Sequence, residues 1–508
     1  MSATSISSVA PSARAPTPPA WLIGFLLALT ALRLLAGAVS PLTEDEAYYR
    51  LWAQALQLGY YDHPPMIAWW IRAGMDLLGD NPLGIRLIPT LASGLSGLLI
   101  FDLASRLGAD RRTAALASLW YNATLIVGMG GGLSTPDAAA TPFWVLTLWC
   151  LARTRTAKGE AWWLAAGVSA GLACLSKYSA LFIAPGVLIW LLMSRNGRAS
   201  LRTPWPWAAA VVAAGLFGLN IAWNAGHDWV TFHKQFGRLA PHGLRPQYLA
   251  ELIATQLLLL NPLIAVFAVR GFGPAWREPE PGQLDGRLLV ATALPFALYL
   301  MLHSLHDRVQ AHWPAPIYPA MAIIAAAAAA RAPSSGWLAW VRGCAAPFGL
   351  GLSAIALAHV ALPATDIAGL NDPTGAIRGW PGFTRTIDRM RLAHGAAWMG
   401  TLSYGATAQL DAAGAGAPVV QLGERDRYLP GDGSWRADMT RPGLVVDLKR
   451  RMKDARLERC FAQVTPLGDV VRRVGISRPD RYSAFLVAGP RRDVLARGCF
   501  EGEARGQP

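Results

Sequence analysis

The sequence contains little charge for its length. Only 15% of the 508 residues are charged and 53% are apolar, whereas a soluble globular protein has about 25% charged residues. The composition therefore excludes an ordinary soluble protein and indicates an integral membrane protein. The net charge of +14 would suggest a nucleic-acid partner only if the basic residues gathered on one soluble face. Most lie between apolar runs or in the C-terminal tail, so no nucleic acid is expected as a partner.

Cysteine is also scarce, and the five cysteines fall into two groups. Cys150, Cys174 and Cys344 lie inside apolar runs, and Cys460 and Cys499 lie in the polar C-terminal tail. No metal-ligand spacing occurs among them. If the tail is extracytoplasmic, Cys460 and Cys499 are candidates for a disulfide, with two unrelated free thiols as the alternative.

Apolar runs of about 17–25 residues, the length that crosses a bilayer, recur along the first two thirds of the chain. They predict about eleven transmembrane helices, although the two runs on either side of Lys177 are short enough for a re-entrant loop. The runs lie near 21–39, 83–104, 113–131, 138–152, 161–176, 178–193, 205–223, 249–267, 288–303, 314–330 and 337–362.

Composition divides the chain into three parts. Residues 1–20 are rich in Ser, Ala, Pro and Thr, which predicts disorder. Residues 21–362 form the predicted transmembrane domain. Its first run, 21–39, is interpreted as an uncleaved span because Arg33 interrupts it and the preceding segment has a single basic residue. A cleaved signal peptide is the alternative, since Ala36-Gly37-Ala38 resembles a cleavage site.

The C-terminal part, residues 363–508, is predicted to be a small extracytoplasmic α/β domain. Strands are expected at 419–422, 444–448 and 484–487, and helices at 405–413 and 448–459. Loops rich in Arg and Lys alternate with acidic loops, so the basic loops are assigned to the cytoplasm. An odd number of spans then exports the C-terminal domain to the periplasmic side of a bacterial inner membrane.

The most polar stretch between two spans runs from Thr43 to Trp70. It contains the acids Glu44-Asp45-Glu46 and the cluster Tyr60-Tyr61-Asp62-His63-Pro64-Pro65. Ionisable groups at a membrane boundary usually serve a function. The structural alternative for the acids is a solvated first helix turn capped by Thr43.

Further polar residues fall on the same predicted face. Asp137 is the only acid in its short turn, where dipole complementation at a helix N-terminus is the alternative interpretation. Lys177 lies between two apolar runs, where an anionic ligand would relieve the cost of the ammonium, or the side chain snorkels to the interface. Additional groups come from His233-Lys234, Asp307-Arg308 and His312-Trp313.

Five motifs together resemble the GT-C superfamily of polyprenyl-phosphate-sugar glycosyltransferases. Asp45-Glu46-Ala47-Tyr48-Tyr49 looks like the first-loop acidic motif of the protein O-mannosyltransferases and lipid A aminoarabinose transferases. Tyr60-Tyr61-Asp62-His63-Pro64-Pro65-Met66 looks like their Pro-Pro motif, and Thr135-Pro136-Asp137-Ala138 like their second acidic motif. Leu175-Ser176-Lys177-Tyr178 and His312-Trp313-Pro314-Ala315-Pro316 are similar to the rhizobial lipopolysaccharide galacturonosyltransferases. The resemblance covers residues 21 to about 362.

The resemblance implies a GT-C-like fold and an inverting glycosyltransferase. The donor would be a sugar on polyprenyl phosphate, and the acceptor an envelope glycolipid such as lipid A or the lipopolysaccharide core. Asp45 is the expected base, and Asp137 would orient the acceptor or share that role. Substrate binding is assigned to Glu46, Tyr48, Tyr60, Tyr61, Asp62, His63, Lys177, Tyr178, Arg308 and His312.

One motif departs from the family pattern, because Asp62-His63 replaces the Glu-Lys of the aminoarabinose transferases. His63 then binds the lipid phosphate less strongly, or only when protonated, and Lys177 and Arg308 take a larger share. No cofactor is required by the residues themselves. The resemblance also implies a divalent metal ion in some relatives, for which Asp62 and His233 are the candidate ligands.

Three other function classes remain open at this point: a lipid-linked saccharide transporter or flippase, a protein O-glycosyltransferase, and a scaffold whose C-terminal domain binds a partner. Transporters often contain internal repeats, and no convincing repeat is present. The acids also gather on one predicted face of the membrane. Both features favour a transferase, with the sugar and the acceptor left undetermined.

Overall fold

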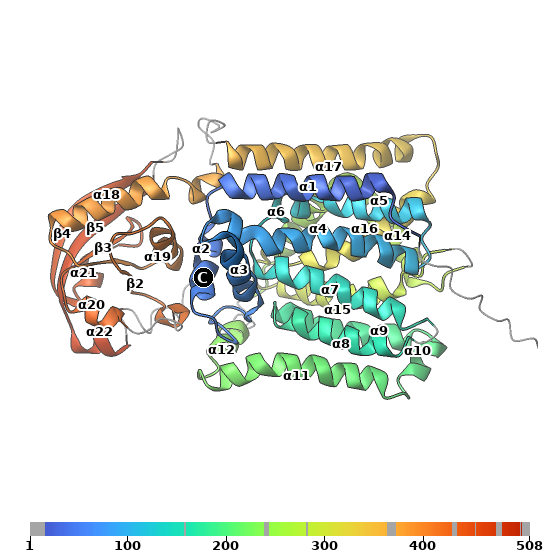
Figure 1. Ribbon diagram of the computed structural model, residues 1–508, viewed down its shortest axis with the longest axis horizontal. Coiled ribbons are helices and arrows are strands. Elements are labelled where there is room, and N and C mark those ends of the chain that lie inside the picture. The colour runs from blue at the N-terminus through green and yellow to red at the C-terminus, as the bar shows by residue number, and fades with distance from the viewer. Residues whose placement is uncertain are drawn as a thin grey trace, which may run out of the picture.

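The computed structural model describes residues 16–156, 159–237, 243–280, 283–362, 372–428, 434–452, 454–473, 480–497 and 499. A bundle of helices fills most of the molecule, and a smaller α/β domain lies at one end of it (Figure 1). Most of the predicted disordered N-terminus, residues 1–15, lies outside the described residues.

Four described helices are long and apolar enough to cross a membrane: α1 (Ala20–Val39), α4 (Pro82–Arg106), α11 (Trp205–Ala225) and α17 (Trp337–Ala361). Four shorter apolar segments, of 10–17 residues, accompany them. The predicted number of about eleven spans therefore stays a prediction. The shorter helices are α5 (Arg111–Asn122), α6 (Leu125–Gly130), α7 (Pro136–Arg153), α8 (Ala161–Cys174), η1 (Tyr178–Phe182), α9 (Ile183–Leu192), α10 (Arg195–Ser200), α12 (Val230–Gly237), α15 (Arg287–His303), η2 (Ala315–Ile317) and α16 (Tyr318–Ala330).

The run expected near 249–267 to be one span consists of two helices with a bend of 108° between them, which is either a broken span or a re-entrant loop. These are α13 (Gln247–Leu259) and α14 (Pro262–Trp276). Asn261 between them has φ 74°, a left-handed conformation that asparagine tolerates better than most residues. The following proline begins α14 at a position where its missing N–H costs nothing.

Small side chains bring the helices of the bundle together. The alanine-rich helix α16 is buried along most of its length and packs against α5 and α14. Helix α1 packs against α4 and α17 at one edge, and α11 packs against α8 at the opposite edge (Figure 1). Close approach through small residues is typical of helix packing in membranes, where lipid supplies no hydrophobic drive between helices.

Two short helices cap the end of the bundle that faces the α/β domain. They are α2 (Glu44–Gln54) and α3 (Met66–Leu78), and the segment between them includes the Tyr60–Pro65 cluster. Thr43 and Glu46 form a capping box at the start of α2, so the predicted Thr43 cap is present. The polar Thr43–Trp70 stretch is thus folded between the bundle and the domain.

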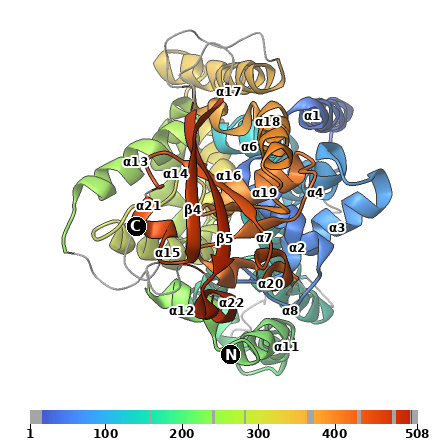
Figure 2. The ribbon, with the colours of Figure 1, turned by 90° about the vertical axis from the view of Figure 1, so that its left-hand side faces the viewer.

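The α/β domain contains a five-stranded sheet of order β2-β1-β3-β5-β4. Strands β2 (Val419–Gln421), β1 (Trp398–Thr401) and β3 (Gly443–Leu448) are parallel, and β5 (Asp480–Pro490) runs antiparallel to β3 and to β4 (Phe461–Arg472). Figure 2 views this domain from its outer side, with β4 and β5 nearest the reader. Its helical segments are η4 (Pro373–Ile377), α18 (Trp380–Ala393), α19 (Tyr404–Ala412), η5 (Arg425–Tyr428), α20 (Trp435–Met439), α21 (Asp454–Leu457) and α22 (Arg492–Arg497).

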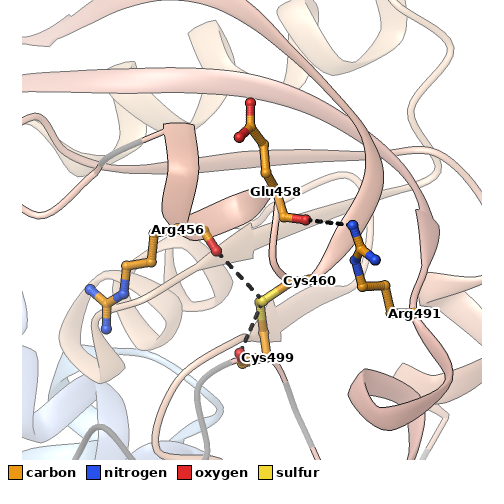
Figure 3. Close-up of a disulfide and its surroundings, with 5 residues drawn as sticks. All are labelled: Arg456, Glu458, Cys460, Arg491 and Cys499. Carbon is orange, nitrogen blue, oxygen red and sulfur yellow. Dashed lines mark hydrogen bonds between the residues drawn. A yellow bond between two sulfur atoms is a disulfide. The ribbon is translucent and has the colours of Figure 1, made fainter.

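Most of the elements predicted for this domain are present. Strands β2, β3 and β5 and helix α19 lie where the sequence predicts them. The predicted helix 448–459 is wrong in extent, because residue 448 ends β3 and only Asp454–Leu457 is helical. Cys460 and Cys499 form the expected disulfide, with their Cα atoms 5.4 Å apart (Figure 3).

Helix α19 connects the domain to the bundle. It packs against α2, and the Arg50 guanidinium of α2 forms ion pairs of 2.6 Å with both Asp411 of α19 and Asp80. The Gln409 amide donates a 2.8 Å hydrogen bond to the Leu42 carbonyl. These contacts hold the domain over the acidic turn of α2.

Candidate active site

The first turn of α2 directs two neighbouring carboxylates in different directions. Glu46 points inward and is fully buried, with its carboxylate 2.6 Å from the Arg86 guanidinium of α4 and 3.0 Å from the Ser134 N–H. Successive helical residues are about 100° apart, so Asp45 faces elsewhere. Glu46 therefore fixes α2 against α4 and against the loop before α7. It was assigned to substrate binding from the sequence, but it does not line the cavity described next.

A cavity of about 620 Å³ lies between the end of the bundle and the α/β domain. Acids, cations and aromatic rings line one part, and apolar side chains line another. Eight of the thirteen predicted site residues are among its lining residues: Asp45, Tyr48, Asp62, His63, Asp137, Lys177, Tyr178 and His312.

Asp137 and Lys177 form an ion pair, and both residues line the cavity. Pro136 begins α7 and Thr135 caps it, which puts Asp137 in the first helical turn. The Lys177 ammonium lies 2.7 and 2.6 Å from the two carboxylate oxygens of Asp137. The Nε2 atom of His312 is 3.6 Å from the same carboxylate, and burial lowers the pKa of His312. Asp137 is therefore a carboxylate already compensated by a cation.

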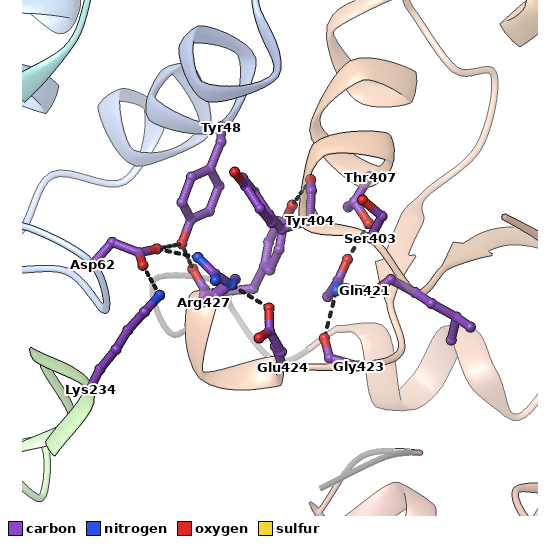
Figure 4. Close-up of polar contacts among 12 residues, drawn as sticks. Tyr48, Asp62, Lys234, Ser403, Tyr404, Thr407, Gln421, Gly423, Glu424 and Arg427 are labelled. Atoms are coloured by element: carbon purple, nitrogen blue, oxygen red, sulfur yellow. Dashed lines mark hydrogen bonds and ion pairs between the residues drawn. The ribbon is translucent and has the colours of Figure 1, made fainter. Parts of the chain in front are cut away.

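Asp62 is also compensated, by cations from two directions. Its carboxylate contacts the Lys234 ammonium of α12 and lies 2.6 Å from Nη1 of Arg427, with the Tyr48 hydroxyl 3.0 Å away (Figure 4). Burial alone would raise the pKa of Asp62, but Lys234 and Arg427 outweigh it and hold the pKa well below its usual range. Asp62 is thus permanently ionised and connects α12, α2 and the α/β domain.

Asp45 differs from both of these acids. Its one hydrogen-bond partner among the described residues is the hydroxyl of Tyr404, which donates to Oδ1 at 2.9 Å. Burial raises the pKa of Asp45 above its ordinary value, and the hydrogen bond from Tyr404 opposes this shift. Asp45 is therefore a partly desolvated carboxylate that faces the cavity and forms no ion pair with the described parts of the chain.

Tyr60 and Tyr61, predicted to line a sugar pocket, do not line the cavity. Tyr60 is fully buried, stacks on Trp52 at 4.4 Å, and donates its hydroxyl to the Trp52 carbonyl at 3.0 Å. The Tyr61 ring lies under the Lys234 ammonium, 4.3 Å from its centroid. Both rings therefore pack the segment that carries Asp62, with Tyr60 against Trp52 of α2 and Tyr61 against Lys234 of α12.

Arg308 and His233 lie outside the site. The Arg308 side chain is 65% exposed and pairs with Glu251 at 3.0 Å, so it does not reach the cavity. His233 is exposed, and its helical neighbour Lys234 takes the Asp62 carboxylate instead. Within the described ranges, no group of three or more His, Cys, Asp or Glu side chains is arranged to hold a metal ion. The Asp62–His233 metal pair therefore stays a prediction without support from this geometry.

Sequence reasoning missed two residues that come from the α/β domain. Tyr404 at the start of α19 and Arg427 in η5 both line the cavity. The Arg427 guanidinium packs on the Tyr404 ring, with Cζ of Arg427 4.4 Å from the ring centroid (Figure 4). They follow Asp45 and Asp62 by more than 350 residues, and the surrounding sequence has the composition of an ordinary polar loop, so no sequence signal distinguishes them.

Comparisons with known proteins agree with this architecture. The model of the dolichyl-phosphate-mannose-protein mannosyltransferase family matches residues 62–223. The lipid A galacturonosyltransferase of Rhizobium johnstonii is 31% identical over 293 residues, which cover 55% of this chain and 59% of that protein. An undecaprenyl phosphate-alpha-4-amino-4-deoxy-L-arabinose arabinosyl transferase of Pseudomonas fluorescens is 33% identical over 148 residues, or 28% of this chain and 25% of that protein.

The fold extends the likeness over the α/β domain. The crystal structure of ArnT from Cupriavidus metallidurans bound to undecaprenyl phosphate superposes with a TM-score of 0.65 and 14% identity, covering 93% of this chain and 99% of that one. Its apo form superposes with a TM-score of 0.62. The helical bundle and the capping α/β domain are therefore similar in fold to that structure. The chain spans less than two thirds of the length of these curated relatives, and over that part it is similar to glycosyltransferases of the GT-C type.

Proposed function

We propose that the protein is an inverting glycosyltransferase that moves a sugar from polyprenyl phosphate to an envelope glycolipid, either lipid A or the lipopolysaccharide core. The observation that carries the proposal is the Asp45 carboxylate, which faces a cavity of about 620 Å³ and has no ion-pair partner in the described ranges. The choice of substrates is supported by the relatives, which are named for transfer of galacturonic acid to lipid A and of aminoarabinose from undecaprenyl phosphate.

The geometry favours Asp45 over Asp137 as the base. Both oxygens of Asp137 are already engaged by the Lys177 ammonium. Oδ2 of Asp45 has no hydrogen-bond partner among the described residues, and burial raises the pKa of Asp45 toward the range that suits a general base. In the proposed step the acceptor hydroxyl gives its proton to Asp45 and attacks the anomeric carbon. The bond to the phosphate oxygen breaks with its electron pair, and the configuration inverts.

The leaving phosphate would be bound by cations that now neutralise acids of the protein. Lys177 and Arg427 both line the cavity, paired with Asp137 and Asp62. Charge that develops on a phosphate in a partly dehydrated site is strongly stabilised by such preorganised groups. Phe182, Phe296 and Tyr299 line the apolar part of the cavity, where the polyprenyl chain would enter from lipid.

We assign the cavity to the periplasmic face of the inner membrane. The Cys460–Cys499 disulfide lies in the α/β domain next to the cavity, and disulfides persist in oxidising compartments such as the periplasm. The basic loops at the opposite end of the predicted topology agree with a cytoplasmic location there. Labelling of cysteines introduced into the α/β domain of intact cells by an impermeant reagent tests this orientation.

The proposed function is tested with purified protein, a polyprenyl-phosphate sugar labelled in the sugar, and lipid A. Asp45→Asn should abolish transfer while the protein stays folded. Glu44→Gln is the matched control, because it removes the neighbouring charge of the same helical turn but does not line the cavity. If wild-type protein moves the lipid-linked sugar across vesicles without forming a product, a transporter replaces the transferase, and retained turnover in Asp45→Asn rejects the assigned base.

A further inference from the structure

Arg33 is a buried cation inside an apolar helix. It lies in α1, is 2% exposed, and precedes the end of that helix at Val39 by six residues, a rise of about 9 Å. Ionisable side chains within transmembrane segments are rare because they are costly, and they usually pair or serve a ligand. None of the chemistry proposed above uses Arg33.

The guanidinium of Arg33 has only neutral partners among the described residues. Its Nη1 atom donates to Oδ1 of Asn122 at 3.2 Å and to the Ser93 hydroxyl at 3.4 Å, and Nη2 donates to the Val127 carbonyl at 2.9 Å. The buried Nε atom has no hydrogen-bond partner. By contrast, the equally buried Arg86 is neutralised by Glu46 at 2.6 Å. The charge of Arg33 is therefore uncompensated within the described parts of the chain.

Arg33 lies directly behind the wall of the substrate cavity. Two of its partners, Ser93 and Val127, line the cavity, and so does Gly131. A Cβ atom at Gly131 would lie 2.5 Å from the Val127 carbonyl oxygen, 2.9 Å from the Ser93 hydroxyl and 3.0 Å from Cζ of Arg33, so the cavity wall is closely packed on these three groups here. No acceptor for the Ser93 hydroxyl proton is found in the described ranges. The hydroxyl is thus placed to donate into the cavity while it accepts from Arg33.

We propose that Arg33 and Ser93 form a second anion subsite, which binds a phosphate group of a lipid substrate. The subsite belongs to α1 and α4, whereas Lys177 follows α8 and Arg427 belongs to the α/β domain. A bound phosphate would supply the missing counter-charge. The Ser93 hydroxyl would donate a hydrogen bond to a phosphate oxygen, and the Arg33 guanidinium, which donates to that hydroxyl, would add its positive charge. The phosphate comes either from the polyprenyl carrier or from a phosphorylated glycolipid acceptor. Only this choice of lipids depends on the proposed function.

The experiment compares lipid binding to detergent-purified wild type and Arg33→Gln by tryptophan fluorescence. Two matched pairs of probes are used: undecaprenyl phosphate against undecaprenol, and bisphosphorylated lipid A against its dephosphorylated form. Arg33→Gln should weaken binding of one phosphorylated probe at least tenfold and leave its neutral partner unchanged. Whichever pair shows this loss identifies the source of the phosphate. Arg106→Gln is the control, because it removes a cation of α4 that pairs with Asp102.

Two further variants keep the inference falsifiable if Arg33→Gln does not fold. Arg33→Lys should retain part of the affinity, and Ser93→Ala, which leaves every charge in place, should weaken the same phosphorylated probe severalfold. Equal affinities of these variants and wild type for all four probes would overturn the subsite and make Arg33 a structural residue. The assay needs no turnover. Wild-type protein that transfers no sugar would therefore contradict the proposed function alone. Lipid affinities that are unchanged in the variants would contradict the subsite alone.

Discussion

The contact between Tyr404 and Asp45 makes the pH dependence of transfer a direct test of the site. Tyr404→Phe removes the only hydrogen bond to the Asp45 carboxylate in the described residues and leaves the ring in place. The hydrogen bond stabilises the ionised form, so its loss raises the pKa of Asp45 further. Because the base acts when ionised, activity should then disappear at a higher pH on the acidic side.

The size of this shift follows from the strength of the lost bond. Hydrogen bonds to charged groups contribute about 1.5–3 kcal/mol, and one pKa unit corresponds to about 1.4 kcal/mol. Water in the cavity replaces part of the lost interaction, so we expect the lower end, about one unit. The other groups that act on Asp45 are unchanged: Asp62 raises its pKa, and His312 and Arg427 lower it.

The assay is the pH profile of kcat/KM for transfer of labelled sugar. The acidic limb of Tyr404→Phe should move up by about one pH unit, and the rate above the limb should stay close to that of wild type. Tyr428→Phe is the control, since its hydroxyl donates to the Tyr404 carbonyl and not to Asp45. A uniform loss of rate at every pH, with the limb unmoved, would refute the role of Asp45 as the titrating base.

Three other variants test the remaining contacts. Glu46→Gln leaves the buried Arg86 charge unpaired and should cost about 3–5 kcal/mol of stability, measured as a lower Tm, whereas an unchanged Tm would contradict the pairing. Lys177→Met removes the cation that holds Asp137 and should lower kcat/KM at least tenfold; equal rates would exclude Lys177 from the site. Cys460→Ser opens the disulfide and should destabilise the α/β domain by about 2–4 kcal/mol, seen as faster proteolysis of that domain.

The charge and apolar patterns along the chain were sufficient for the class of protein and for most of the cavity. Low charge and recurring apolar runs predicted a helical membrane protein, and the helices are present. Asp45, Asp137, Lys177 and His312 were singled out because each is polar at the end of an apolar run, and all four line the cavity. Local composition predicts these residues because a membrane-spanning run is apolar along its length, so a polar residue at its end stands out in the sequence.

The same patterns failed where a neighbour in space decides the role of a residue. Glu46 and Asp45 are adjacent and chemically alike, yet Arg86 buries one and leaves the other facing the cavity. Tyr60 was assigned to substrate binding, but its ring stacks on Trp52 inside the protein. The bend between α13 and α14 was missed because hydropathy averages over the single residue that turns the chain.

The sequence by itself determined that this protein has a largely helical, apolar bundle and resembles the GT-C glycosyltransferases, because apolar length and short motifs are local properties. Only the tertiary structure decided which acid is free to act and which groups complete the cavity. Tyr404 and Arg427 reach the site from a domain that begins more than 300 residues after Asp45. Packing of α19 on α2 brings them there, and no spacing within the chain encodes that contact.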